Sequence, residues 1–383
     1  MAEITGEDGL VYNLDGDGGR THVFIVALGH YPFFRDGGPA ADADAPLKQL
    51  VSPPRSARLM ADWFIHDYNY PPAQLGSVAL MISEQEPAPY TSPSGDWLLR
   101  VPTYDAFAKA AEVWINRGMT SEKNRMVFLF CGHGYGYGRE ASLLMADFDF
   151  RSLNKWEQAL DLGLFHHGLE RCAADEQIFL IDACRRPHGD QAAPDAAIGR
   201  SPIHPDQNGR KAFQTRRNAP LFFSTGDAQP ARGRSDGASV FTDAFLRSVA
   251  GMAANDDNGD WRVNNYLLLY ALSHVSFRLT AQEFPEPQQP QGGEARLFDF
   301  HYLKTPPISP IYVARQDNEP CGPGELRIEI DGASQTRECT ADELEVELPL
   351  PLGAYSFELA HGGGLTLSAK QSSRPTFKKA RLS

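Results

Sequence analysis

The sequence predicts an α/β protein with a mostly parallel sheet, helices on both faces of that sheet, and a small C-terminal antiparallel β module. Between residues 20 and 280, short apolar segments alternate with amphipathic segments of helical periodicity. The apolar segments are nearly continuous, as buried strands of a doubly covered sheet require. After residue 303 the pattern changes to segments that alternate apolar and polar residues, separated by glycine-rich turns.

The predicted elements follow one another in strand–helix order. The predicted strands are rich in β-branched and aromatic residues and lie at 22–28, 78–82, 126–130, 177–181 and 221–224. The predicted helices carry apolar residues at three- and four-residue spacing. They lie at 56–68, 156–172, 241–249 and 266–279, and a further helix begins after Thr103, whose side chain can cap it. Segments rich in Gly, Pro and polar residues are predicted to be loops, above all 29–46 and 185–219.

We divide the chain into three parts. Residues 1–20 are polar and form a predicted N-terminal extension, and residues 21–303 form the α/β domain. Residues 304–383 form the predicted β module, whose start is marked by Pro306 and Pro307. The module has no cluster of reactive side chains, so its expected role is binding or docking.

Composition limits the partners and the compartment. The chain of 383 residues has 36 Lys and Arg against 49 Asp and Glu, a net charge of −13. This charge repels phosphate backbones, so we expect no nucleic-acid partner. No apolar run approaches the ~18–20 residues that span a bilayer, and the acidic N-terminus has no secretory signal, so we expect no membrane association. Five cysteines are too few and odd in number for a disulfide framework, which indicates a reducing, cytoplasmic location.

Reactive side chains follow two of the predicted strands. His133 comes after the third strand and Cys184 after the fourth. Ligands bind at the carboxyl ends of strands in open parallel sheets, and neighbouring strands lie about 4.8 Å apart. We therefore predict that Cys184 is a nucleophile and His133 its general base, with the backbone N–H groups of Gly134 and Cys184 as an oxyanion hole. The alternative for a single such cysteine is an inert buried residue.

These motifs resemble those of the caspase-like cysteine peptidases, the clan of caspases, metacaspases and their bacterial relatives. The segments concerned are FLFCGHG at 128–134, FLIDACR at 179–185, and GASVFTDAFL at 237–246. The His–Cys spacing is similar to that of caspases, whose nucleophile motif is Gln-Ala-Cys-x-Gly. The resemblance covers about residues 20–303. It implies the caspase-like fold and peptide-bond hydrolysis by His133 and Cys184, in regulated proteolysis such as stress, cell-death or antiviral responses.

Two departures from the caspase motif bear on specificity. Asp182 stands in place of Gln and Arg186 in place of Gly. In this family the residue two before the nucleophile lines the S1 pocket. The resemblance therefore implies that Asp182 selects Arg or Lys at P1, as in metacaspases, with Asp36 as a candidate second acid.

Two alternatives to this specificity stay open. Arg35 lies in the same loop as Asp36, and a caspase uses an arginine of that region to bind P1 Asp. We favour Asp182 because its register to Cys184 is fixed, whereas that of the loop is not. Asp182 is alternatively an acid at the end of the sheet with no substrate role.

The long segment 185–219 occupies the place of the cleaved intersubunit linker of caspases. If P1 is basic, it contains four candidate self-cleavage sites, namely Arg200, Arg210, Arg216 and Arg217. An activating protease or protein partner is then expected in addition to protein or peptide substrates. The alternative is a solvated surface loop.

Other motifs indicate no cofactor. The glycines from Gly132 to Gly138 do not match a dinucleotide-binding loop. Residues 256–260 resemble part of a calcium loop, but Ala254 and Asn265 occupy its first and last ligand positions, so we expect a turn and no metal site. Some metacaspases are activated by Ca²⁺, so the resemblance leaves a calcium requirement open. The competing functional hypothesis is a non-catalytic scaffold or adaptor of the same fold.

Overall fold

The computed structural model describes residues 3–14, 16, 18–137, 140–185, 199–205, 217–226, 229–257, 259–281, 283–293, 296–361 and 365–383. The chain forms two compact units. The first contains Met1–Leu246 and Leu272–Arg296, and the second contains Arg247–Ala271 and Leu297–Ser383. In the described ranges no helix is both long and apolar enough to span a bilayer.

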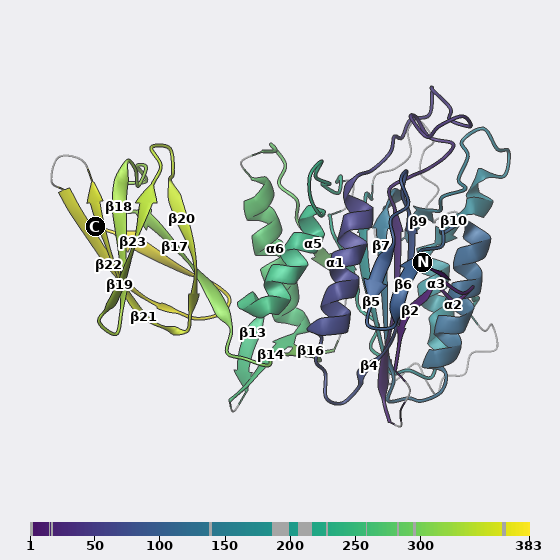
Figure 1. Cartoon of the computed structure of the whole chain (residues 1–383), viewed down its shortest axis with the longest axis horizontal. Coiled ribbons are helices and arrows are strands. Elements are labelled where there is room, and N and C mark those ends of the chain that lie inside the picture. The colour runs from purple at the N-terminus through teal and green to yellow at the C-terminus, as the bar shows by residue number, and fades with distance from the viewer. Residues whose placement is uncertain are drawn as a thin grey trace. The chain divides into compact units, whose positions relative to one another are not determined.

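The first unit contains the predicted parallel sheet (Figure 1). Among the described residues the sheet has seven strands in the order β15-β12-β11-β7-β3-β4-β2. The parallel strands are β3 (Arg20–Leu28), β4 (Gln74–Ser83), β7 (Arg125–Gly132), β11 (Glu176–Ala183) and β12 (Leu221–Phe223). The edge strands β2 (Leu10–Asn13) and β15 (Gln291–Gly292) pair antiparallel. The predicted α/β class is thus confirmed, and residues 10–13 of the predicted extension belong to the sheet.

Helices cover both faces of this sheet. Helix α1 (Ser52–His66) contacts β3, β4 and β7, and Trp63 of α1 packs edge-on against Phe245 of α5 (Val240–Arg247). Helix α2 (Tyr104–Gly118) contacts β3 and β4 on the other face, where α3 (Leu162–Gly168) also lies (Figure 1). As predicted, Thr103 caps α2, because its hydroxyl accepts the Ala106 N–H at 3.3 Å.

Side-chain alternation along the strands assigns residues to the two faces. Phe128 of β7 and Phe179 of β11 face α2 and α3. The ring centroids of Phe128 and Phe165, a residue of α3, lie 5.3 Å apart. The alternate residues of each strand point to the opposite face, toward α1 and α5. Cys131 of β7 and Asp182 of β11 are among them. This alternation determines which reactive side chains lie below the carboxyl ends of β7 and β11.

The predicted helix over 156–172 is wrong in part. The structure has a 3-10 turn η1 (Lys155–Gln158), strand β10 (Ala159–Asp161), α3 and a further 3-10 turn η2 (Leu169–Arg171). The Asp161 side chain accepts the Leu164 N–H at 2.8 Å and so begins α3 within the predicted helix. β10 pairs with β9 (Glu140–Leu144), which pairs with β8 (Gly134–Tyr137). A separate small sheet combines β1 (Glu3–Ile4), β6 (Gly95–Leu98) and β5 (Tyr90–Ser92).

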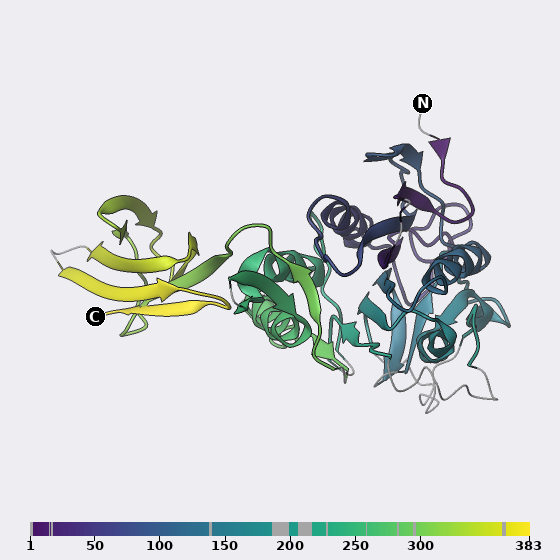
Figure 2. The ribbon, with the colours of Figure 1, turned by 90° about the horizontal axis from the view of Figure 1, so that it is seen from below.

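The second unit contains the predicted β module. Its described strands form two sheets (Figure 2). An apolar core that includes Val313, Leu326 and Phe357 draws on both sheets. One sheet has the order β20 (Glu345–Pro351), β17 (Ile308–Arg315), β23 (Lys378–Leu382), and the other β19 (Ala333–Cys339), β18 (Gly324–Ile330), β21 (Gly353–His361), β22 (Leu365–Ser373). The pairs are antiparallel except β17–β23.

The second unit also contains a three-stranded sheet and a π-helical turn. The sheet consists of β13 (Ala254–Asp257), β14 (Asp260–Asn264) and β16 (Asp299–Tyr302), and η3 (Ser248–Met252) precedes it. Helix α6 (Asn265–Thr280) begins in the second unit and ends in the first.

Candidate active site

Strand register places His133 beside Cys184. β7 and β11 pair in parallel with Cys131 opposite Asp182 and Gly132 opposite Ala183, and His133 and Cys184 are the next residues after these two strand ends. The approach is close, because a Cβ atom at Gly134 would lie only 3.2 Å from the Cys184 carbonyl oxygen. The structure therefore gathers the predicted base and nucleophile at neighbouring strand ends.

His133 is a buried imidazole with a fixed orientation. Its side chain is 9% exposed and packs against the rings of Tyr31 and Phe34, with centroids 5.1 and 5.7 Å away. Its Nε2 lies 2.7 Å from the carbonyl oxygen of Lys48, so in the neutral ring Nε2 carries the proton and Nδ1 the lone pair. Burial lowers the pKa of His133 to about 4, although the Lys48 hydrogen bond opposes this shift. Neutral His133 is the form that accepts a proton.

The main chain around His133 bears on the predicted oxyanion hole. Leu144 N–H donates to the His133 carbonyl at 3.0 Å, and His133 N–H donates to the Tyr31 hydroxyl at 2.9 Å. Residues 133 and 144 therefore lie opposite each other just before the β8–β9 ladder and share one backbone hydrogen bond. In the adjacent pair, Gly134 and Leu143, the backbone N–H groups point away from the partner strand. This geometry is compatible with Gly134 N–H as an oxyanion donor.

Cys184 directly follows β11. All five cysteines lie in the described part of the chain and form no disulfide, and Cys184 is partly exposed whereas the other four are buried. The N–H of Ala231 donates to its Sγ at 3.3 Å. Hydrogen-bond donors favour the charged form of an acceptor, so this contact supports a thiolate. Sequence reasoning missed Ala231, as it missed Lys48, because both act through main-chain atoms and their side chains give no signal.

Arg185, directly after Cys184, is buried at the ends of β12 and β15. Its guanidinium lies 4.2 Å from the centre of the Phe223 ring and donates to Thr225 O at 2.8 Å and Gln291 Oε1 at 2.6 Å. These contacts fix the chain on the C-terminal side of the nucleophile. The residue that follows, Arg186, lies outside the described residues.

Asp182 is a buried carboxylate on the α1–α5 side of the sheet. It is 5% exposed, and Cys131 Sγ lies 3.4 Å from its Oδ2. Burial raises the pKa of Asp182, whereas hydrogen bonds from Ser239, Ser224 and Cys131 partly oppose the shift. Among the described residues no Lys, Arg or His side chain forms an ion pair with it. A buried carboxylate without a cation is costly, which makes this position receptive to a cationic ligand group.

The structure does not bring Asp36 or Arg35 into contact with Asp182 in the described part of the chain. Asp36 is exposed and adopts a left-handed backbone conformation with φ 63°. Arg35 donates through Nη2 to the Ala45 carbonyl at 3.1 Å, within its own loop. Both residues remain sequence-based candidates for S1.

The candidate cleavage sites divide into two groups. Arg210 and Arg216 lie outside the described residues. The main chain of Arg200 bridges to β10, since its N–H donates to Ala159 O and its carbonyl accepts Asp161 N–H, both at 2.9 Å. The Arg217 side chain is 8% exposed and pairs with Glu170 at 3.3 Å.

An arginine side chain forms ion pairs with the acidic segment 256–260, which resembles part of a calcium loop. The Arg262 guanidinium lies 3.1 Å from Asp257, 3.2 Å from Asp260 and 3.3 Å from Asp299. Asp256 instead accepts the Gly259 N–H at 2.8 Å. Within the described ranges no group of three or more His, Cys, Asp or Glu side chains is arranged to hold a metal ion.

Comparisons with known proteins identify the family of the chain. Residues 48–291, more than half of the chain, match the family model for the caspase domain of the C14 peptidases. The chain therefore belongs to this caspase-like family of cysteine peptidases, and the predicted resemblance is confirmed. Among solved structures, the crystal structure of caspase-1 from Spodoptera frugiperda is similar, with TM-score 0.45 and 12% identity over 77% of this chain and 98% of that chain. No curated protein matched the sequence.

Proposed function

We propose that the chain is a cysteine endopeptidase in which Cys184 is the nucleophile and His133 the general base. The observation that carries the proposal is the oriented, neutral imidazole at the register position beside the partly exposed thiol. A base must be unprotonated and aimed by a third group, and burial together with the Lys48 carbonyl supplies both conditions. A scaffold without activity has no need of this arrangement.

The chemistry proceeds through a thioester. His133 Nδ1 accepts the Cys184 proton, and the thiolate attacks the scissile carbonyl carbon to form a tetrahedral oxyanion. The N–H groups of Gly134 and Cys184 stabilise that oxyanion. Collapse breaks the C–N bond, and His133 donates its proton to the leaving amine. A water molecule, deprotonated by His133, then attacks the thioester, which releases the acid and regenerates the thiol.

The specificity we propose is for Arg or Lys at P1, with Asp182 as the S1 carboxylate. Its support is a buried acid, two residues from the nucleophile, with no ion-pair partner among the described residues. The alternative, P1 Asp bound by Arg35, is less well supported because that guanidinium already bonds the Ala45 carbonyl. Asp36 remains a candidate second acid, at an exposed position.

We further propose that the enzyme acts on protein substrates in the cytoplasm and is activated by cleavage or by a protein partner. The free state of all five cysteines is compatible with a reducing compartment. A role in stress or antiviral defence follows from the family resemblance alone.

Two measurements test the dyad. An activated Cys184 should react with iodoacetamide near pH 7 faster than the four buried cysteines, located by peptide mapping. Cys184→Ala and His133→Ala should each abolish cleavage of a P1-randomised peptide library. Cys172→Ala should retain it, because this buried thiol contacts Met126 at the opposite, amino end of β7. Full activity of either dyad variant, with the fold verified by circular dichroism, removes that residue from the mechanism.

A further inference from the structure

A groove lies on the β21–β22 face of the second unit. Two adjoining hollows of about 380 and 650 Å³ form it, and they share Ala354 and Ser372. Small side chains form much of its lining, and two cationic residues, Lys370 and Arg374, stand along the β22 side. The larger hollow also reaches Trp261 of the neighbouring β13–β14 hairpin.

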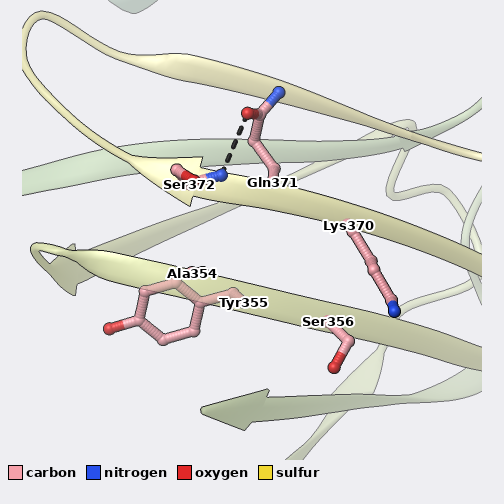
Figure 3. A pocket seen from close by; sticks show the side chains of 6 residues that line it. All are labelled: Ala354, Tyr355, Ser356, Lys370, Gln371 and Ser372. Atoms are coloured by element: carbon pink, nitrogen blue, oxygen red, sulfur yellow. Dashed lines mark hydrogen bonds between the residues drawn. The ribbon is translucent and has the colours of Figure 1, made fainter. Parts of the chain in front are cut away.

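Strand geometry explains the shape of the groove. Lys370, Ser372 and Arg374 alternate along and just after β22, so their side chains share one face. On β21, Ser356 lies opposite Lys370, and Ala354 opposite Ser372. Figure 3 shows the Lys370 side chain extending toward Ser356, whereas Gln371 points to the other side. The short side chains between the two cations leave room for an extended ligand.

Within the described part of the chain, the two cations of the groove have no ion-pair partner. Among the described residues no carboxylate lies within 4.0 Å of the Lys370 or Arg374 side-chain nitrogens. The carboxylate of the lining is Asp256, which accepts the N–H of Gly259 in its own turn. Glu358 shares this face of β21, two residues beyond Ser356, but makes no ion pair with Lys370.

We propose that this groove binds an acidic segment of another polypeptide. Its carboxylates pair with Lys370 and Arg374, its main chain lies over Ala354 and Ser372, and one of its side chains contacts Trp261. A nucleic acid is a poorer occupant, because two cations neutralise few phosphates and the rest of the chain repels them. Because the lining residues belong to the second unit, the proposal does not depend on Cys184 chemistry.

Direct binding tests this proposal on the full chain carrying Cys184→Ala, which prevents cleavage of the probe. The probe is a fluorescein-labelled ten-residue peptide of alternating Glu and Gly, measured by anisotropy at low ionic strength. It should bind, and added salt should weaken binding. Lys370→Glu and Arg374→Glu should each weaken it by about tenfold, since each turns an attraction into a repulsion. Asp256→Asn should strengthen it.

The matched control is Lys379→Glu, which makes the same charge change at an exposed residue of β23 that does not line the groove. Its affinity should stay within about twofold of the parent, because the Lys379 side chain is exposed to screening by salt and does not line the groove. An equal loss in this control overturns the proposal, as does absence of binding at millimolar peptide. Tighter binding of an oligothymidylate of equal charge also overturns it in favour of nucleic acid. Circular dichroism verifies that each variant is folded.

Discussion

The Nε2 atom of His133 lies 2.7 Å from the carbonyl oxygen of Lys48. Residue 48 belongs to the loop between β3 and α1, so a main-chain atom from one loop fixes the tautomer of a ring on another. Because the carbonyl accepts from Nε2, the lone pair of the neutral ring resides on Nδ1. The same ring is buried against Tyr31 and Phe34, which disfavours its charged form.

This relationship predicts an unusually acidic limb in the pH profile of kcat/KM. Burial lowers the pKa of His133 from 6.5 to about 4, so the neutral base persists until the pH falls through about 4. Activity toward a P1-Arg peptide should therefore be retained at pH 5.5, where an ordinary histidine is mostly protonated. A limb near pH 6.5 would contradict the buried, neutral base.

Folding must be monitored in the same pH series. The unfolded state takes up a proton on this histidine near pH 6.5 and the folded state only near pH 4. The free energy of unfolding therefore decreases as the pH falls between these values. Circular dichroism at each pH separates loss of the base from loss of the fold.

Replacement of Asp182 by Asn should reduce cleavage after Arg by about tenfold or more. The change removes the charge and keeps the shape, and a charge-assisted hydrogen bond in a buried site contributes ~1.5–3 kcal/mol. The measurement is kcat/KM for matched P1-Arg and P1-Lys peptides, with Arg the better substrate because its guanidinium pairs with both carboxylate oxygens. Asp36→Asn tests the candidate second acid, and a comparable loss there would assign it to S1 as well. A library that prefers P1 Asp would refute the role of Asp182 and favour Arg35.

A prediction about stability concerns the amino end of β7, opposite the end that carries His133. Arg125 at the start of β7 is 1% exposed. Its Nε donates to Glu176 at 2.7 Å, its Nη1 donates to the Tyr68 hydroxyl at 3.1 Å, and its guanidinium lies 3.4 Å from the centre of the Tyr70 ring. Arg125→Ala should lower the free energy of unfolding by about 3 kcal/mol, because it leaves the partner carboxylate unpaired. Urea denaturation measures this loss. Arg327→Ala, at an exposed position on β18, should change it by less than about 0.5 kcal/mol.

The sequence was sufficient to predict the sheet and the positions of the two reactive residues. Near-continuous apolar segments identify β7 and β11, and residues placed directly after parallel strands must meet at one edge of the sheet. The break of the 156–172 helix was not predictable from periodicity, because apolar spacing over 159–169 fits both β10 with α3 and a single helix. The helix begins at Asp161 because residues 159–161 pair with β9 as strand β10, and this pairing depends on the tertiary structure.

The supporting parts of the site escaped sequence reasoning for another reason. The acceptor at Lys48 and the donor at Ala231 are main-chain atoms, which every residue possesses, so only the fold reveals them. The Arg185 contacts depend on Gln291, more than a hundred residues away along the chain. Burial of Asp182 was equally invisible, because its position at a strand end is compatible with either a solvated or an enclosed carboxylate.

The last prediction concerns self-cleavage of the 185–219 segment. Incubated wild-type protein should be nicked after Arg210 or Arg216 and not after Arg200 or Arg217. A scissile bond must enter an active site in extended form with its P1 side chain free, but the backbone of Arg200 is bonded to β10 and the Arg217 side chain is buried against Glu170. Mass spectrometry of the new termini identifies the sites.

Two variants complete this test. Cys184→Ala protein should stay whole when incubated alone and should be cut at the same sites when active enzyme is added, because the substrate segment is unchanged. Arg210 and Arg216 replaced together by Gln should slow nicking, whereas Arg200→Gln should leave its rate unchanged. Cleavage after Arg200 at the wild-type rate would mean that the β10 bridge opens readily and offers no protection. Nicking of isolated Cys184→Ala protein would show that Cys184 is not the nucleophile of this reaction.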